Sequence, residues 1–254
     1  MPDRLRGKRA LIYGGATGLG YACAESMARE GATVYLSGRR EARLAEAAAK
    51  LSSIGRAGFG SGDATIEADV MRVTGLAVEF MGGLDTLVTS AGSSSVGSIL
   101  DESLKSFREI CDANLVTTFL CSSHGAPYLV ANGKGSIIAI ASMYGLVGQY
   151  QRVAYCASKA GVIGLVRAMA LDLADKGVRA NAICPGFIET ELTREMISRE
   201  PDPEAVLQKR RHMHPIGRSG RVEEIGEAAV YLASDDAAWT TGQYFAVDGG
   251  YTIR

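Results

Sequence analysis

The sequence predicts an α/β protein whose core is a parallel sheet covered by helices on both faces. Short β-branched runs alternate with longer helical patterns along all 254 residues, which is the pattern of repeated strand–helix–strand units. The connections are short and rich in glycine, and no low-complexity tract or Pro/Ser-rich linker interrupts the alternation. We therefore expect a single domain over residues 1–254, built as a Rossmann-type doubly wound sheet of seven strands.

The predicted elements follow one another regularly along most of the chain. The seven strands are expected at 9–13, 33–37, 56–60, 86–89, 135–140, 178–183 and 243–247. The clear helical patterns lie at 22–29, 41–51, 73–81, 103–130 and 153–175. The alternation of strands and helices is interrupted at 185–220, which contains two short polar helical stretches and a basic cluster at 209–211. We expect the segment 185–220 to be a lid over the substrate.

Charge and cysteine content narrow the possible partners and location. Lys and Arg number 27 against 28 Asp and Glu, a net charge of −1, so the chain lacks the positive charge of a nucleic-acid-binding protein. No apolar run reaches the roughly 18 residues of a membrane span, and the charged N-terminus does not resemble a signal peptide. The five cysteines form no Cys-x-x-Cys pair, which favours reduced, buried thiols without a metal site. A cytoplasmic protein acting on a small molecule is expected.

A glycine-rich turn, GGATGLG, joins the first strand to the first helix. Such a turn presents free backbone N–H groups and the positive end of the helix dipole at one point, where a pyrophosphate binds. Gly14 permits the tight turn, Gly18 allows the backbone to approach the ligand, and Gly20 allows the helix to pack closely on the sheet. Thr17 and Leu19 belong to the same predicted contact. Dinucleotide binding follows from this position in the first strand–helix unit.

The end of the second strand indicates which dinucleotide binds. An acidic side chain is typical there when the ribose 2′-hydroxyl is recognised, but this chain has Arg39 and Arg40. Guanidinium groups suit a 2′-phosphate, so NADP(H) is preferred and NAD(H) is not excluded; the alternative is a solvated helix start. Asp63, followed by Ala64, comes after the third strand and either accepts a hydrogen bond from the adenine or belongs to an ordinary turn.

A tyrosine and a lysine lie four residues apart near the start of the long helix at 153–175. This spacing places Tyr155 and Lys159 on one helix face, where a neighbouring ammonium favours the phenolate form. Ser142 lies at the C-terminal end of the fifth predicted strand, at the sheet edge where ligands bind. The pair alone is weak support for catalysis because such spacings arise by chance on many helices.

Along essentially its whole length the sequence resembles the short-chain dehydrogenase/reductase family. Within the family it is similar to the 3-oxoacyl-carrier-protein reductase-like and ketoreductase members. The matching positions are the Gly14, Gly18 and Gly20 turn, Asp63, Ala91-Gly92, Asn114, Ser142, Tyr155 with Lys159, Pro185-Gly186, Thr190 and the VDGG segment at 247–250.

The resemblance implies a role for each candidate catalytic residue. Tyr155 exchanges a proton with the substrate oxygen, and Ser142 orients that oxygen. Lys159 binds the nicotinamide ribose and lowers the pKa of Tyr155. Asn114 holds a water in the proton relay. Further cofactor contacts are implied for Tyr155, Lys159, Ala91, Gly92, Pro185, Gly186, Ile188 and Thr190.

The resemblance also implies a homotetramer, in which the helices at 103–130 and 153–175 form one interface and the C-terminal strand another. Two positions depart from the family pattern. Tyr13 stands where a threonine is usual, and Thr89-Ser90 stands where Asn-Asn is usual. We expect a compensated exchange in which a large residue on the first strand faces smaller ones on the fourth.

The expected function is hydride transfer between NADP(H) and a ketone or secondary alcohol. A rival of another class is an NADP-binding regulatory or scaffold protein without turnover, and a rival within enzymes is an epimerase or dehydratase. The sequence leaves the substrate and the physiological direction open. The basic cluster at 209–211 either guides an anionic substrate tail or forms a solvated helix face.

Overall fold

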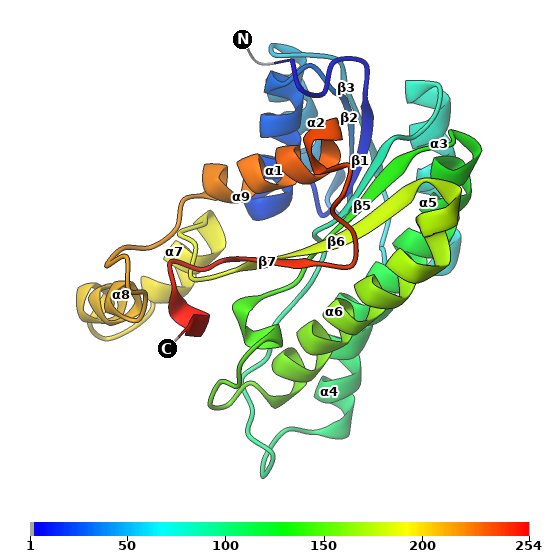
Figure 1. The fold of residues 1–254 in the computed structure, drawn as a ribbon. Coiled ribbons are helices and arrows are strands. Elements are labelled where there is room, and N and C mark those ends of the chain that lie inside the picture. The colour runs from blue at the N-terminus through cyan, green and yellow to red at the C-terminus, as the bar shows by residue number, and fades with distance from the viewer. Residues whose placement is uncertain (1–2, 254) are drawn as a thin grey trace.

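A computed structural model of the chain describes residues 3–253, apart from the side chain of Leu192. Its centre is a seven-stranded sheet in the order β3-β2-β1-β4-β5-β6-β7 (Figure 1). The strands are β1 (Arg9–Tyr13), β2 (Thr33–Gly38), β3 (Ala57–Ser61), β4 (Thr86–Thr89), β5 (Gly135–Ile140), β6 (Val178–Pro185) and β7 (Tyr244–Val247). All neighbouring strands run parallel. The predicted fold class is confirmed.

Helices cover both faces of the sheet, as the doubly wound pattern requires. The helices α1 (Gly18–Arg29), α2 (Glu41–Ser52) and α9 (Val222–Ala233) pack on one face. The helices α3 (Glu67–Met81), α5 (Thr117–Ala131) and α6 (Val153–Leu173) pack on the other. Because successive side chains of a strand point to opposite faces, Ile12 and Leu11 of β1 belong to different core clusters.

Some predicted helix boundaries were wrong. The single helix expected at 103–130 is divided into α4 (Leu104–Cys111), a π-helical turn η1 (Asp112–Val116) and α5. Helix α3 begins six residues earlier than the predicted range of 73–81, and α9 was not predicted. In this π-helical turn Asn114 is hydrogen-bonded to Ser93 and Ser158, which are distant in the chain, and sequence periodicity does not report such contacts.

Helix α6 also corrects the expectation that no segment is long and apolar enough to span a membrane. The stretch Val153–Lys176 has a mean hydropathy of 1.3 and meets that criterion by length and composition. The helix packs against β6 and the π-helical turn, and Ser158 and Lys159 are buried within the fold. A helix that covers a parallel sheet is apolar for this reason, so we interpret α6 as a core helix.

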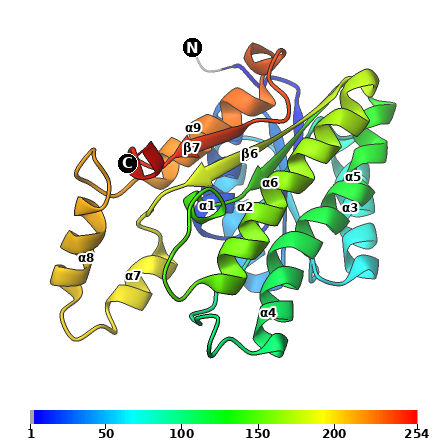
Figure 2. The same ribbon diagram turned by 60° about the horizontal axis from the view of Figure 1, so that its bottom comes forward.

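The segment 185–220 contains two short helices, α7 (Glu191–Ile197) and α8 (Pro203–His212). Figure 2 shows both helices extending away from the sheet beyond the end of β6. Ile188 and Gly220 pair as an isolated bridge at the base of this segment. The two predicted polar helical stretches are therefore present, and the lid function stays a prediction.

Tyr13 points beneath α3. Its side chain is 1% exposed and belongs to the cluster that contains Val70 and Ala77. The Tyr13 hydroxyl donates to the Val70 carbonyl at 3.1 Å and lies 2.8 Å from Thr74 Oγ1. Thr89 is its register partner on β4. The large residue therefore lies beside a small one, which supports the hypothesis of a compensated exchange.

Substitutions at Tyr13 test this hypothesis. We expect Tyr13→Phe to lower the free energy of unfolding by about 1 kcal/mol, because it removes one buried hydrogen-bonding group. Tyr13→Thr should lower it by roughly 3 kcal/mol, because a cavity opens beneath α3. Urea unfolding with a cofactor titration measures both effects. Wild-type stability and affinity in Tyr13→Thr would contradict the compensation.

Candidate functional site

The glycine-rich turn lies at the C-terminal end of β1, where the strand order reverses between β2 and β4. The N–H groups of Gly14 and Gly15 donate to the Ser37 carbonyl at 2.8 and 3.1 Å. Gly14 has a φ of +78°, and a Cβ on it would lie 2.6 Å from Ala91 N. A Cβ on Gly20 would overlap the Gly14 carbonyl. Both positions therefore require glycine.

The first turn of α1 is open to a ligand. Thr17 is the N-cap residue, its side chain makes no capping hydrogen bond, and the first turn carries no acidic residue. Gly18 has a φ of +57°, and a Cβ on it would have only Thr190 Cγ2 nearby, at 3.8 Å. Leu19 packs its side chain on the core and leaves its backbone at the turn. This cradle fits a dinucleotide pyrophosphate.

The residues expected to determine the preference between NADP(H) and NAD(H) lie together after the ends of β2 and β3. Arg39 is 78% exposed, and its Nη1 atom lies 4.0 Å from Asp63 Oδ2. Arg40 is the N-cap residue of α2 and is also exposed. Asp63 Oδ1 accepts from the backbone N–H and the hydroxyl of Thr65, so it holds the turn that includes the half-buried Ala64.

The turn after β4 brings the Ala91-Gly92 pair against Asn114. A Cβ on Gly92 would lie 2.6 Å from Asn114 Oδ1 and 3.6 Å from Lys159 Nζ. Asn114 is fully buried in the π-helical turn, where its Oδ1 accepts from Ser93 N at 2.8 Å. Its Nδ2 donates to the Ser93 carbonyl and to Ser158 Oγ. The side chain thus joins this turn to α6, and its role in a water relay stays a prediction.

Ser142 and Tyr155 meet at the C-terminal end of β5. Ser142 begins a short 3-10 helix, η2 (Met143–Gly145), and its Oγ accepts from Tyr144 N at 3.1 Å. Burial raises the pKa of Tyr155, and a hydrogen bond with Ser142 together with the charge of Arg152 opposes this rise. Tyr155 is therefore a phenol at neutral pH and can donate a proton to an oxygen beside Ser142.

Lys159 is close to Tyr155 but is turned toward the backbone of β5. Its Nζ donates to the Ile140 carbonyl at 2.8 Å and lies 5.8 Å from the centre of the Tyr155 ring. Burial lowers the pKa of Lys159 to about 8. Burial raises the pKa of Tyr155, and the charge that opposes this rise is that of Arg152. That Lys159 lowers the pKa of Tyr155 stays a prediction.

The segment after β6 borders the same edge of the sheet. Pro185 ends the strand, and Gly186 donates its N–H to the Val247 carbonyl at 2.9 Å. A Cβ on Gly186 would lie 2.7 Å from the Asp248 Cα atom, so this contact requires glycine. Ile188 is buried, and Thr190 is the N-cap residue of α7, held by a reciprocal bond with Thr193.

Two residues near the site were not predicted from the sequence. Arg152 precedes α6 and donates from Nη1 to the Ser95 carbonyl at 2.7 Å. His214, in the segment 185–220, is 3% exposed. Its Nδ1 lies 2.5 Å from the Asp248 carbonyl, and its Nε2 accepts from Phe187 N at 3.3 Å. Its position in the motif HPIGR gave no sign of these long-range contacts, whereas the proximity of Arg152 to Tyr155 in sequence could have drawn attention to it.

Comparison with known proteins identifies the family. Residues 14–252 match a family model described as enoyl-(acyl carrier protein) reductase. The 2-(S)-hydroxypropyl-CoM dehydrogenase 3 of Xanthobacter autotrophicus is 38% identical over 255 residues, which is 99% of this chain and 99% of that protein. The chain belongs to the short-chain dehydrogenase/reductase family. This confirms the resemblance seen in its motifs.

Other short-chain dehydrogenases/reductases are similarly close. Glucose 1-dehydrogenase of Gluconobacter oxydans is 36% identical over 254 residues, 99% of this chain and 94% of that protein. A crystal structure described as a short-chain alcohol dehydrogenase from Sinorhizobium meliloti 1021 is 33% identical, with a TM-score of 0.92 and 99% of each chain covered. The protein is an oxidoreductase that acts on secondary alcohols or ketones, and dehydrogenases of this family use NAD(P)(H).

Proposed function

We propose that this protein transfers a hydride between NADP(H) and a ketone or secondary alcohol, with Tyr155 exchanging the proton. The observation that carries the proposal is the meeting of Ser142 and Tyr155 at the sheet edge. The glycine-lined turn after β1, which fits a dinucleotide, opens at the same edge.

The protein side chains bind the cofactor, orient the substrate oxygen and transfer the proton. When bound, the nicotinamide supplies or accepts the hydride. Ser142 orients the substrate oxygen through its hydroxyl, and Tyr155 donates a proton to that oxygen in reduction or removes it in oxidation. Lys159 holds the nicotinamide ribose, and Asn114 holds the loop at Ser93 against α6. Because burial raises the pKa of Tyr155, the phenol form needed for reduction is present at neutral pH.

The preference for NADP(H) rests on the end of β2. Arg39 and Arg40 are exposed there, and the one carboxylate within 4.0 Å of Arg39 among the described residues is that of Asp63. Rotation of the Arg39 side chain leaves both guanidinium edges available for a 2′-phosphate. The remaining proposed cofactor contacts are Gly14, Thr17, Gly18, Leu19, Gly20, Asp63, Ala64, Ala91, Gly92, Tyr155, Lys159, Pro185, Gly186, Ile188 and Thr190.

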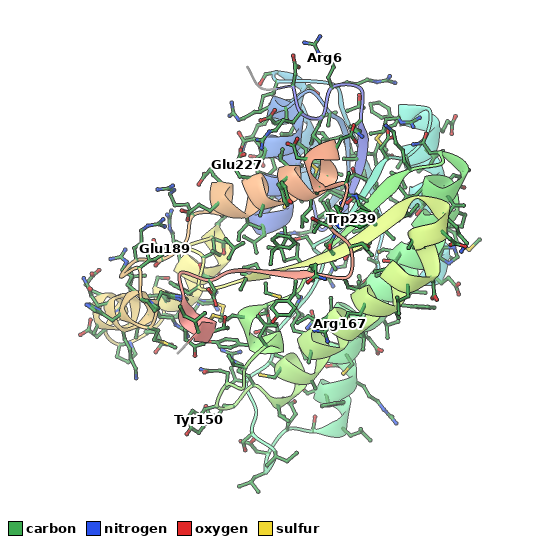
Figure 3. All side chains as sticks on the ribbon, viewed as in Figure 1. Arg6, Tyr150, Arg167, Glu189, Glu227 and Trp239 are labelled. Atoms are coloured by element: carbon green, nitrogen blue, oxygen red, sulfur yellow. The ribbon has the colours of Figure 1, made fainter. Side chains whose placement is uncertain are left out.

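Cofactor titration tests the preference. We expect NADPH to bind at least tenfold more tightly than NADH, about 1.4 kcal/mol, and Arg39→Ala to remove most of that difference. Enhancement of NADPH fluorescence is the measurement, because Trp239 is fully exposed on the loop before β7 and makes a poor reporter (Figure 3). As the control, Arg43→Ala on the following helix should leave the ratio unchanged. Equal affinities in the wild type would contradict the preference, and binding without turnover of any ketone would favour a regulatory protein.

We also propose a homotetramer that works in the cytoplasm. Exposed apolar side chains on the helical face and on the C-terminal edge support the assembly: Phe119, Tyr128, Leu171, Tyr244 and Ile253. All five cysteines are free thiols, which suits a reducing compartment. Light scattering of the purified protein should report four times the 26.7 kDa of one chain, and a monomeric mass would refute the assembly. Recovery of the protein in a secreted or membrane fraction would refute the location.

A further inference from the structure

The three residues of the basic cluster at 209–211 lie on α8, but their side chains have different surroundings. Arg211 is held by carboxylates, with its Nη2 atom 3.1 Å from Glu189 Oε1 and its Nη1 atom 3.9 Å from Glu204 Oε1. Figure 3 labels Glu189 just before α7. Lys209 is exposed. Arg210 is half-buried, and among residues 3–253 no carboxylate oxygen lies within 4.0 Å of its guanidinium. Lys209 likewise has no carboxylate partner among these residues, so Arg210 is the half-buried member of the cluster whose charge is not neutralised.

The guanidinium of Arg210 lies over an aromatic ring at the end of β6. Its Cζ atom is 5.4 Å from the centre of the Phe187 ring. Phe187 directly follows Gly186, and its N–H donates to His214 Nε2. Stacking on a ring fixes the plane of a guanidinium while its N–H edges stay available to an acceptor. Arg210 is thus placed on α8 with its donors available.

Arg152, which directly precedes α6, provides a second guanidinium. It precedes Tyr155 by three residues, and its Nη1 donates to the Ser95 carbonyl at 2.7 Å and to Ser94 Oγ at 3.1 Å. Both acceptors are neutral, and Glu102 on this loop accepts from Ser95 Oγ instead. The described part of the chain places no carboxylate within ion-pair distance of Arg152. Its charge is therefore held in position without being neutralised.

The charges of both guanidinium groups act on Tyr144, the side chain next to Tyr155. Tyr144 packs edge-on against Tyr155, with 6.5 Å between the ring centres. Burial raises the pKa of Tyr144 to about 12, and the charges of Arg210 and Arg152 both act in the opposite direction. A chain of contacts joins Arg210 to this ring: Phe187 beneath Arg210 donates to His214, whose ring lies 5.5 Å from that of Tyr251, and the Tyr251 ring lies 6.0 Å from that of Tyr144. Two cations without carboxylate partners among the described residues, one on α8 and one at the start of α6, therefore act on the tyrosine that packs against the proton-transfer residue.

We propose that the substrate carries an oxyanion, most simply a carboxylate, which Arg210 and Arg152 bind while the carbonyl or carbinol carbon lies at Tyr155. This inference rests on the proposed function and specifies its substrate class. Guanidinium groups bind carboxylates through paired N–H donors, and a partly buried site strengthens the attraction relative to water. Because Arg210 belongs to α8 and Arg152 precedes α6, the anion links the lid to the sheet.

Matched acids and esters test the inference. The probes are 3-oxobutanoate, 4-oxopentanoate and 5-oxohexanoate, each compared with its methyl ester and assayed with NADPH and with NADH. The esters preserve the ketone and remove the charge, and the series varies the distance between the two groups. We expect at least one acid to have a kcat/KM tenfold or more above that of its ester. The difference should lie mainly in KM, because the anion is bound equally in the ground and transition states.

Variants assign the preference to named side chains. Arg210→Gln should reduce the acid-to-ester ratio at least tenfold, Arg210→Lys should retain part of it, and Arg210→Glu should bring it below one. Lys209→Gln removes the same charge from the adjacent exposed position and should leave the ratio unchanged. Arg152→Gln should reduce the ratio independently and also shift the pH profile upward, because the Arg152 charge lowers the pKa of Tyr155. Thermal melting of each variant identifies any loss of folding.

The possible outcomes separate the inference from the function on which it rests. Acid preference that depends on Arg210 but not on Lys209 supports it. Equal turnover of acids and esters, or a preference for esters, overturns the inference and leaves the oxidoreductase proposal intact. An acid preference that is equally sensitive to both substitutions reflects general surface charge and also overturns it. If no ketone in the series is reduced with either cofactor, the proposed function fails together with the inference.

Discussion

Tyr155→Phe is expected to reduce kcat by roughly 10²- to 10⁴-fold, the usual contribution of a positioned general acid. The substitution removes only the hydroxyl, so the ring keeps its packing against Tyr144. We therefore expect the variant to fold and to bind cofactor. Steady-state kinetics in both directions, together with NADPH fluorescence titration, separate the lost proton transfer from any loss of binding.

A second tyrosine provides the control for this substitution. Tyr150 is 94% exposed at the loop before α6 and points away from the fold (Figure 3). Tyr150→Phe makes the same chemical change five residues away and should leave kcat within about twofold, because it removes no buried group. If Tyr155→Phe kept a tenth or more of the wild-type rate, Tyr155 would not be the proton donor.

Gly14→Ala should weaken cofactor binding at least tenfold, which corresponds to about 1.4 kcal/mol. A Cβ at this position would lie 2.6 Å from Ala91 N and 2.9 Å from Ala91 Cα. The turn after β1 and the turn after β4 would therefore have to separate, and both are proposed to contact the cofactor. Titration with NADPH measures the loss of affinity, and thermal melting measures the accompanying loss of stability.

Gly82→Ala distinguishes this steric effect from backbone strain. Gly82 has a φ of +74°, close to the +78° of Gly14, but a Cβ on it would meet nothing within 4 Å. Gly82→Ala should lose about 1–2 kcal/mol of stability, because a side chain disfavours the left-handed conformation. Gly14→Ala should lose more, because its Cβ also meets Ala91. Only Gly14→Ala should also lose cofactor affinity. If the two variants bound cofactor equally well, the contact with Ala91 would not shape the site.

The sequence by itself determined the fold class and the position of the main motifs. Strand positions 9–13, 86–89 and 135–140 match the structure, because alternating strand and helix patterns are local properties of the chain. The turn at Gly14 and Gly20 was also predictable, because Gly14 takes a positive φ and a Cβ on Gly20 would overlap the Gly14 carbonyl within the same turn. The order of strands then places the candidate residues at one edge of the sheet.

Only the tertiary structure decided how individual side chains are used. Tyr13 points beneath α3, and the Lys159 ammonium donates to the Ile140 carbonyl. The basic cluster separates into Arg211, paired with Glu189, and Arg210, which lies over Phe187. These outcomes depend on contacts between segments that are distant in the chain. Periodicity and spacing report which face a residue occupies, but burial and the choice of partner are set by what packs against that face.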